Sequence, residues 1–152
     1  AIDFQVGTLS KAIGAHGGFV ATTTAHRRWL LNTGRAFIFS TALPLPIVAA
    51  ARAAIDVTVT SPKRRERLWA HIHHFARRLD RPALGPIFPI VVGSEAQALD
   101  LSRSLLAHGF HVPAIRPPTV PEGTCRLRVT LSAGHDENDL NILSNLIQDA
   151  IL

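Results

Sequence analysis

The hydrophobic pattern after residue 60 limits the fold more than any other feature of the sequence. Between residues 61 and 79, apolar residues recur at spacings of three and four, which predicts an amphipathic helix begun by Ser61 and Pro62. Trp69 and Phe75 are expected on the buried side of that helix. The expected elements are, in order, helix, strand, helix, strand, strand and helix, over residues 61–79, 87–92, 94–108, 110–115, 126–131 and 136–147. This alternation predicts a small α/β domain.

The first sixty residues differ and are predicted to be the edge of a larger domain. Two short strands are expected over residues 3–9 and 17–22, joined by a glycine-flanked loop. Helices are expected to begin with Thr24 as N-cap and near Pro46. Two strands joined by a turn cannot bury a core by themselves. The chain also contains no methionine, so we expect its true N-terminus to lie elsewhere.

Composition and charge exclude several classes of protein. Hydrophobic residues make up 47% and charged residues 18% of the sequence, which argues against a disordered chain. The longest apolar stretch, residues 42–51, is too short to span a bilayer. The net charge of +5 fits an anionic ligand, a nucleic acid or a basic surface. A single cysteine, Cys125, allows no internal disulfide, and we expect a cytoplasmic protein or, in a eukaryote, an organellar one.

Lys11 is the candidate for chemistry within the first sixty residues. It is one of two lysines in the chain, and it follows a predicted strand in a glycine-flanked segment. An amine in such a place can be desolvated, which favours the neutral form that Schiff-base chemistry needs. Thr8 and Ser10 add hydroxyls of the kind that bind a phosphate. Taken alone, these features fit a solvated loop lysine better, because glycine-rich turns are common.

The sequence GTLSKAIGAHGG, residues 7–18, resembles the segment around the cofactor lysine of the α-oxoamine synthase family. These fold-type I, pyridoxal-phosphate-dependent acyltransferases condense an amino acid with an acyl-CoA or acyl-carrier thioester. The resemblance implies that Lys11 forms a Schiff base with the cofactor and then acts as acid and base at the α-carbon of the amino acid. It also implies that Thr8 contacts the cofactor phosphate.

A second segment, FSTALP at residues 39–44, resembles the turn of the same family whose hydroxyls reach the cofactor phosphate of the neighbouring subunit. The resemblance therefore implies that Ser40 and Thr41 bind the cofactor and that the protein is a homodimer. The sequence departs from the family pattern at Leu45, which displaces the second proline of the turn to Pro46. Without the resemblance, Ser40 and Thr41 would be interpreted as part of an ordinary turn.

A third segment, AIRPPTVP at residues 114–121, resembles the C-terminal part of these enzymes, together with residues 123–128. The resemblance implies that Arg128 holds the amino-acid carboxylate and that Arg116 lies near the acyl end of the site. A planar guanidinium can bind a carboxylate through two parallel hydrogen bonds, which suits both tasks. The segment is closer to the alanine-using branch of the family than to the glycine-using members. From the residues alone, an Arg128 that faces solvent is the commoner outcome.

Together, the three motifs imply an α/β fold in two parts. Residues 1–60 would be terminal elements of a fold-type I large domain with the cofactor lysine, and residues 61–152 the small C-terminal α/β domain. The implied reaction is the decarboxylative condensation of L-alanine with a pimeloyl thioester to 8-amino-7-oxononanoate, a step of biotin biosynthesis. The family places the acid and the histidine that contact the cofactor ring before the lysine. We therefore expect residues 1–152 to be inactive alone.

Two alternative functions stay open. One is a sister activity of the same family, which includes glycine C-acetyltransferase, serine palmitoyltransferase and 5-aminolevulinate synthase. The other is a non-catalytic module that binds through a basic surface.

The helix over residues 61–79 also carries three histidines among five arginines. His71 and His74 can share a face, but no Cys, Asp or Glu stands at ligand spacing beside them, so we expect no metal site. A basic helix can bind nucleic acid, yet solvated basic faces are common, and neither a nucleic-acid partner nor a membrane is expected. His135 falls in a further family segment and receives no role.

Overall fold

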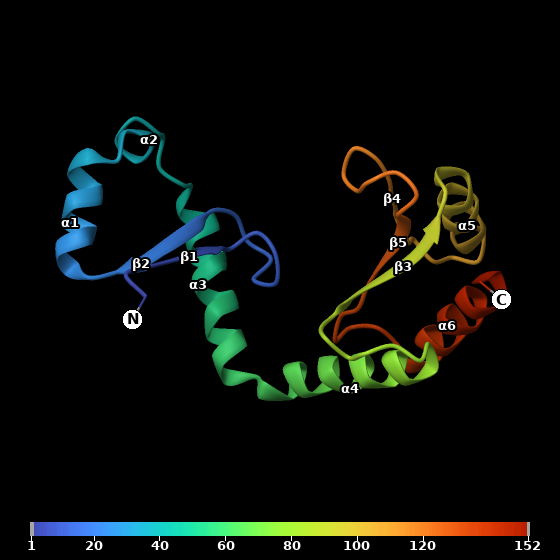
Figure 1. The fold of residues 1–152 in the computed structure, drawn as a ribbon. Helices are drawn as coiled ribbons and strands as arrows, with labels where there is room; N and C mark the ends of the chain where they lie inside the picture. The colour runs from blue at the N-terminus through green and yellow to red at the C-terminus, as the bar shows by residue number, and fades with distance from the viewer. Residues whose placement is uncertain (1, 152) are drawn as a thin grey trace. The chain divides into compact units, whose positions relative to one another are not determined.

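The computed structural model describes residues 2–151 and divides into two compact units (Figure 1). The N-terminal unit comprises residues 1–62 and the C-terminal unit residues 63–152. The division thus follows Pro62, whereas the sequence placed a boundary after residue 60. The assignment of these units to two domains of a larger enzyme stays a prediction.

The N-terminal unit contains one antiparallel hairpin and three helices. Strands β1 (Phe4–Thr8) and β2 (Gly18–Thr22) pair along their full length, with Val6 opposite Val20. The helices are α1 (Thr24–Thr33), the short α2 (Arg35–Ile38) and α3 (Leu45–Thr60).

Capping residues account for where two of these helices begin. The hydroxyl of Thr23 accepts a hydrogen bond from the His26 amide at 3.2 Å, so the N-cap of α1 is Thr23 and the prediction of Thr24 was wrong by one residue. Pro46 lies in the first turn of α3, as predicted, where its missing N–H costs no hydrogen bond. The short helix α2 was not predicted.

Very little of the N-terminal unit is buried. Among its described residues only Ala51 is buried, and several large apolar side chains are exposed: Val6, Phe37, Phe39, Leu45 and Val59. This agrees with the expectation that a single hairpin cannot bury a core by itself.

The C-terminal unit is a three-stranded antiparallel sheet packed against helices. Its elements are α4 (Pro62–Arg78), β3 (Ile87–Gly93), α5 (Glu95–Ala107), β4 (Ala114–Ile115), β5 (Cys125–Thr130) and α6 (Glu137–Ile151). The order in the sheet is β3-β5-β4 (Figure 1). The predicted succession of helix, strand, helix, strand, strand and helix is therefore confirmed.

The strand predicted over residues 110–115 is much shorter than expected, because only Ala114 and Ile115 form β4. The Val112 carbonyl accepts a hydrogen bond from the Ser102 hydroxyl of α5 at 2.6 Å, which directs it toward α5. Pro113 has no N–H to donate. Both effects delay the start of the strand to Ala114.

The core of the C-terminal unit lies between the helices and one face of the sheet. Its centre is an edge-to-face pair of Phe75 on α4 and Phe88 on β3, with ring centroids 5.1 Å apart. Trp69 was expected in this core and is 45% exposed, with its ring tilted against that of His73. It follows Leu68 by one residue and is turned about 100° from it around the helix, which takes it off the buried stripe. Further core residues are Ile72, Ile90, Leu105, Leu127, Val129, Leu140, Leu143 and Ile147.

Two further properties bear on the class of protein. Cys125 is a buried free thiol on β5, one residue before the strand expected over residues 126–131. Within residues 2–151, no helix combines the length and the hydropathy needed to cross a membrane.

Candidate functional site

The loop that carries Lys11 connects β1 to β2 and is closed by backbone hydrogen bonds. The Leu9 amide donates to the Gly17 carbonyl at 2.9 Å, and the Ala15 amide donates to the Leu9 carbonyl at 2.9 Å. Lys11 begins a turn in which the Gly14 amide donates to the Lys11 carbonyl, also at 2.9 Å. Gly14 has a φ of +66°, a conformation that glycine adopts without steric cost. Lys11 is therefore held in an ordered turn at the end of the hairpin.

Thr8 fixes the start of this loop next to Lys11. Its hydroxyl oxygen lies 2.8 Å from that of Ser10 and accepts a hydrogen bond from the Ser10 amide at 3.2 Å. The structure thus brings the hydroxyls of Thr8 and Ser10 together on either side of Leu9. Lys11 itself is exposed, so the described residues do not supply the desolvation expected for its amine.

The FSTALP segment contacts the lysine loop through Leu43. A β-carbon added to Gly17 would lie 2.7 Å from the Leu43 Cδ1 atom, so the leucine packs directly against the loop backbone. A side chain at Gly17 would displace Leu43 and would also strain the backbone, because Gly17 has a φ of +100°. In the same segment, the Ser40 hydroxyl donates to the Ala36 carbonyl and Thr41 is exposed.

Arg128 lies on the central strand of the C-terminal sheet. Its neighbours Leu127 and Val129 are buried in the core, and the alternation along β5 leaves Arg128 exposed on the opposite face. The Arg128 amide donates to the Pro113 carbonyl at 3.0 Å, and its strand partner in β3 is Pro89. The side chain is therefore accessible, and its backbone is held between two neighbouring strands.

Arg116 leaves the same sheet directly after β4, next to Ile115, which pairs with Arg126. Its guanidinium Nη1 donates to Glu95 Oε1 of α5 at 2.5 Å, and both side chains are about half exposed. Sequence reasoning did not single out Glu95. An acid in the first turn of a helix is usually explained by the partial positive charge of the helix start. The sequence near Glu95 therefore gave no reason to expect its pairing with Arg116.

The histidines and several of the arginines of α4 have structural partners. The buried His71 has its Nδ1 atom 3.0 Å from the Ser132 carbonyl, and the His74 Nε2 atom lies 2.8 Å from Asn141 Oδ1. Arg67 donates to the His135 carbonyl at 3.2 Å, and Arg78 donates to side chains of α6. Much of the polar character of α4 therefore serves packing within the unit. Within residues 2–151, no three His, Cys, Asp or Glu side chains are grouped to hold a metal ion.

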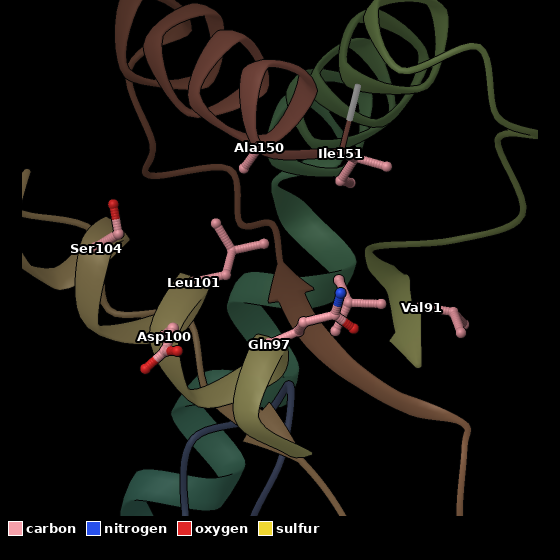
Figure 2. Close-up of a pocket in the computed structure, with 8 residues that line it drawn as sticks. Val91, Gln97, Asp100, Leu101, Ser104, Ala150 and Ile151 are labelled. Carbon is pink, nitrogen blue, oxygen red and sulfur yellow. The ribbon is translucent and has the colours of Figure 1, made fainter. Parts of the chain in front are cut away.

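Both units contain pockets, and none of the six predicted site residues lines the two described next. In the C-terminal unit, a cavity of about 490 Å³ lies between β3, α5 and the end of α6 (Figure 2). Figure 2 shows that Gln97, Asp100, Leu101 and Ser104 line it from α5. In the N-terminal unit, a mainly apolar cavity of about 460 Å³ is lined by residues that include Phe19, Leu31 and Phe37. The predicted site residues lie on exposed surface instead.

The chain was compared with protein families and with curated sequences. It matches the family model "Aminotransferase class I and II" over residues 2–147. It is 46% identical over 150 residues to 8-amino-7-oxononanoate synthase of Arabidopsis thaliana, a match of 99% of this chain and 32% of that protein. It is 49% identical over 142 residues to the synthase of the same name from Anaeromyxobacter dehalogenans strain 2CP-C, covering 90% of this chain and 36% of the relative. The chain thus spans about a third of the length of these relatives.

Two solved structures illustrate the similarity in fold. Serine palmitoyltransferase from S. paucimobilis, solved with a bound PLP–myriocin aldimine, superposes with a TM-score of 0.90 at 30% identity, over 98% of this chain and 39% of that one. The 8-amino-7-oxononanoate synthase of Francisella tularensis superposes with a TM-score of 0.82 at 26% identity, over 97% of this chain and 45% of that one.

Proposed function

Because the chain belongs to the aminotransferase class I and II family, we propose that it forms the lysine-bearing and carboxylate-binding part of a pyridoxal-phosphate-dependent 8-amino-7-oxononanoate synthase. The observation that carries this proposal is the identity of 46% and 49% to two curated synthases of that name. The family membership and the solved structures confirm the predicted resemblance and the α/β fold class of the fold-type I transferases.

The residues of the N-terminal unit fit pyridoxal phosphate. Lys11 offers an accessible primary amine in an ordered turn, which is what an aldehyde requires in order to bind. The hydroxyls of Thr8 and Ser10 lie next to it. Hydroxyls are suitable donors to phosphate oxygens, so the donor set suits the cofactor.

Each residue has a defined task in the proposed reaction. When bound, pyridoxal phosphate supplies the electron sink that makes the α-carbon of an amino acid acidic. Lys11 holds the cofactor, removes the α-proton of L-alanine and later returns a proton. Arg128 binds the alanine carboxylate until it leaves as CO₂, and its exposed position on β5 suits this task. Arg116 binds the anionic acyl donor, whose thioester carbon forms the new bond as the thiol departs.

The cellular setting of the enzyme is also part of this proposal. We place the synthase in the cytoplasm, or in an organelle of a eukaryote, as a homodimer in which Ser40 and Thr41 serve the cofactor of the partner subunit. The substrates are L-alanine and a pimeloyl thioester, carried by CoA or by an acyl-carrier protein.

A second candidate is a serine palmitoyltransferase-like activity. The solved serine palmitoyltransferase superposes with a higher TM-score than the solved 8-amino-7-oxononanoate synthase, 0.90 against 0.82. The two functions differ in both substrates, so the full-length gene product should be assayed with L-alanine and L-serine against pimeloyl-CoA and palmitoyl-CoA. Product from only the serine and palmitoyl pair would favour the second candidate.

The direct test uses the two lysines of the chain. In the full-length gene product, Lys11→Ala should abolish both the visible absorbance of the bound cofactor and the turnover of L-alanine with pimeloyl-CoA, because no other described amine lies in this loop. Lys63→Ala is the matched control, since Lys63 is the other lysine, lies exposed at the start of α4 and should change neither readout. Turnover that survives Lys11→Ala would refute the assignment.

A further inference from the structure

An ion pair between Glu95 and Arg116 joins the first turn of α5 to the end of β4. The two residues are 21 positions apart in sequence, and Nη1 of Arg116 lies 2.5 Å from Oε1 of Glu95. The side chains are 49% and 52% exposed, respectively. The contact holds the side chain of Arg116, one of the predicted site residues, against Glu95.

Stability does not explain this pair well. Ion pairs between half-exposed side chains contribute little to folding, because water screens the charges and both side chains lose rotamer freedom. The start of α5 is already capped, since the Ser94 side chain accepts from the Gln97 amide in a complete capping box. Glu95 is therefore not needed to begin the helix.

The pair has a clear consequence for the Arg116 guanidinium. A free arginine side chain samples many rotamers, and a ligand that binds it must bear the cost of ordering it. Glu95 sits on a helix and fixes one nitrogen of the guanidinium, which leaves other N–H donors of the planar group free for an incoming anion. The carboxylate itself is favoured at the helix start by the partial positive charge there.

We propose that Glu95 is a positioning residue that pre-orients Arg116 for the anionic acyl donor. This inference rests on the proposed function, because it takes Arg116 as the residue at the acyl end of the site. Two groups on pimeloyl-CoA share the required chemistry, the distal carboxylate of the pimeloyl chain and the phosphates of CoA.

The test measures both Michaelis constants in the full-length, cofactor-loaded gene product. Glu95→Gln, which keeps the shape and removes the charge, should raise the KM for pimeloyl-CoA by roughly two- to five-fold, the range expected for a partly exposed ion pair. The KM for L-alanine and kcat should stay unchanged. A similar rise in KM with octanoyl-CoA, which lacks the distal carboxylate, would assign the anion to CoA, whereas a rise with pimeloyl-CoA alone would assign it to the acyl chain.

The matched control is Asp100→Asn. Asp100 lies on the same helix and pairs with Arg103 at 3.2 Å on a more exposed surface, so its loss removes the same charge and a comparable contact. This variant should leave both KM values unchanged. A KM for pimeloyl-CoA that rises equally in both variants would show a general effect of charge and would overturn the inference.

A double-mutant cycle separates this inference from the proposed function. If Glu95 acts through Arg116, Glu95→Gln should have no further effect in an Arg116→Gln background. If Arg116→Gln raises the KM for pimeloyl-CoA and Glu95→Gln does not, only the inference fails. If Arg116→Gln leaves that KM unchanged, the proposed role of Arg116 fails, and absence of synthase activity in the unmodified protein overturns the proposed function itself.

Discussion

Truncation of Phe75 tests whether stability is concentrated in the C-terminal unit. Phe75 is fully buried on α4 and packs edge-to-face on Phe88 of β3, so Phe75→Ala removes a contact between a helix and the sheet. Phe39→Ala is the matched control in the N-terminal unit, because the chemical change is the same and Phe39 is 75% exposed.

The expected magnitude follows from burial. Removing a buried phenylalanine costs about 3–5 kcal/mol, and loss of an edge-to-face pair places Phe75 in the upper part of that range. A unit of about 90 residues has a free energy of unfolding of roughly 5–13 kcal/mol. The substitution should therefore remove a third or more of the stability of the C-terminal unit. Phe39→Ala, at an exposed position, should lower the free energy of unfolding by less than about 0.5 kcal/mol.

Hydrogen exchange on residues 1–152 measures both the protection of each unit and the effect of each substitution. In the unmodified chain, slow exchange should be confined to the C-terminal unit, with the amides of β3 and β5 the most protected. Phe75→Ala should accelerate the exchange of these amides roughly 900- to 5,000-fold, and Phe39→Ala should leave them unchanged. Equal protection of both units, or an effect of Phe75→Ala below about 1 kcal/mol, would refute the reasoning.

Three further predictions concern the proposed enzyme. In the full-length gene product, Arg128→Ala should weaken the binding of L-alanine by roughly 30-fold to several thousand-fold while cofactor absorbance persists, because a desolvated ion pair is worth about 2–5 kcal/mol. Arg128→Lys should recover little of this affinity, and an unchanged KM for L-alanine would exclude Arg128 as the residue that binds the carboxylate. Co-expression of Lys11→Ala subunits with Thr41→Val subunits should give hybrid dimers with one intact site; no recovered activity would place Thr41 in its own subunit's site. Residues 1–152 alone should release no CO₂ from L-alanine, because the family places the acid and the histidine that contact the cofactor ring before the lysine; measurable release would show that nothing beyond these residues is needed.

Local sequence patterns located the helices and strands well because those patterns depend on near neighbours. The spacing of three and four residues in α4 and the alternation in β5 each reflect one buried face of a regular element. One error arose where a distant residue intervened, and another arose from the position of a side chain around its helix. The expected strand over residues 110–115 is shortened by a hydrogen bond from Ser102, and Trp69 lies beside the buried stripe of its helix.

The sequence by itself predicted which residues form the candidate site. Lys11, Thr8 and Arg128 stand out through motifs of consecutive residues, and such motifs can be read without coordinates. The alternation along β5 was also enough to predict that one of its faces is buried.

Only the tertiary structure decided how these residues are held. The packing of Leu43 on Gly17 joins two motifs, and the pair between Glu95 and Arg116 connects residues 21 positions apart. The exposure of Lys11 likewise depends on which other segments cover its loop. Contacts of this kind depend on how separate helices and strands pack against one another. The pattern of side chains along one segment cannot predict them, because periodicity shows which face is buried but not which residue covers it.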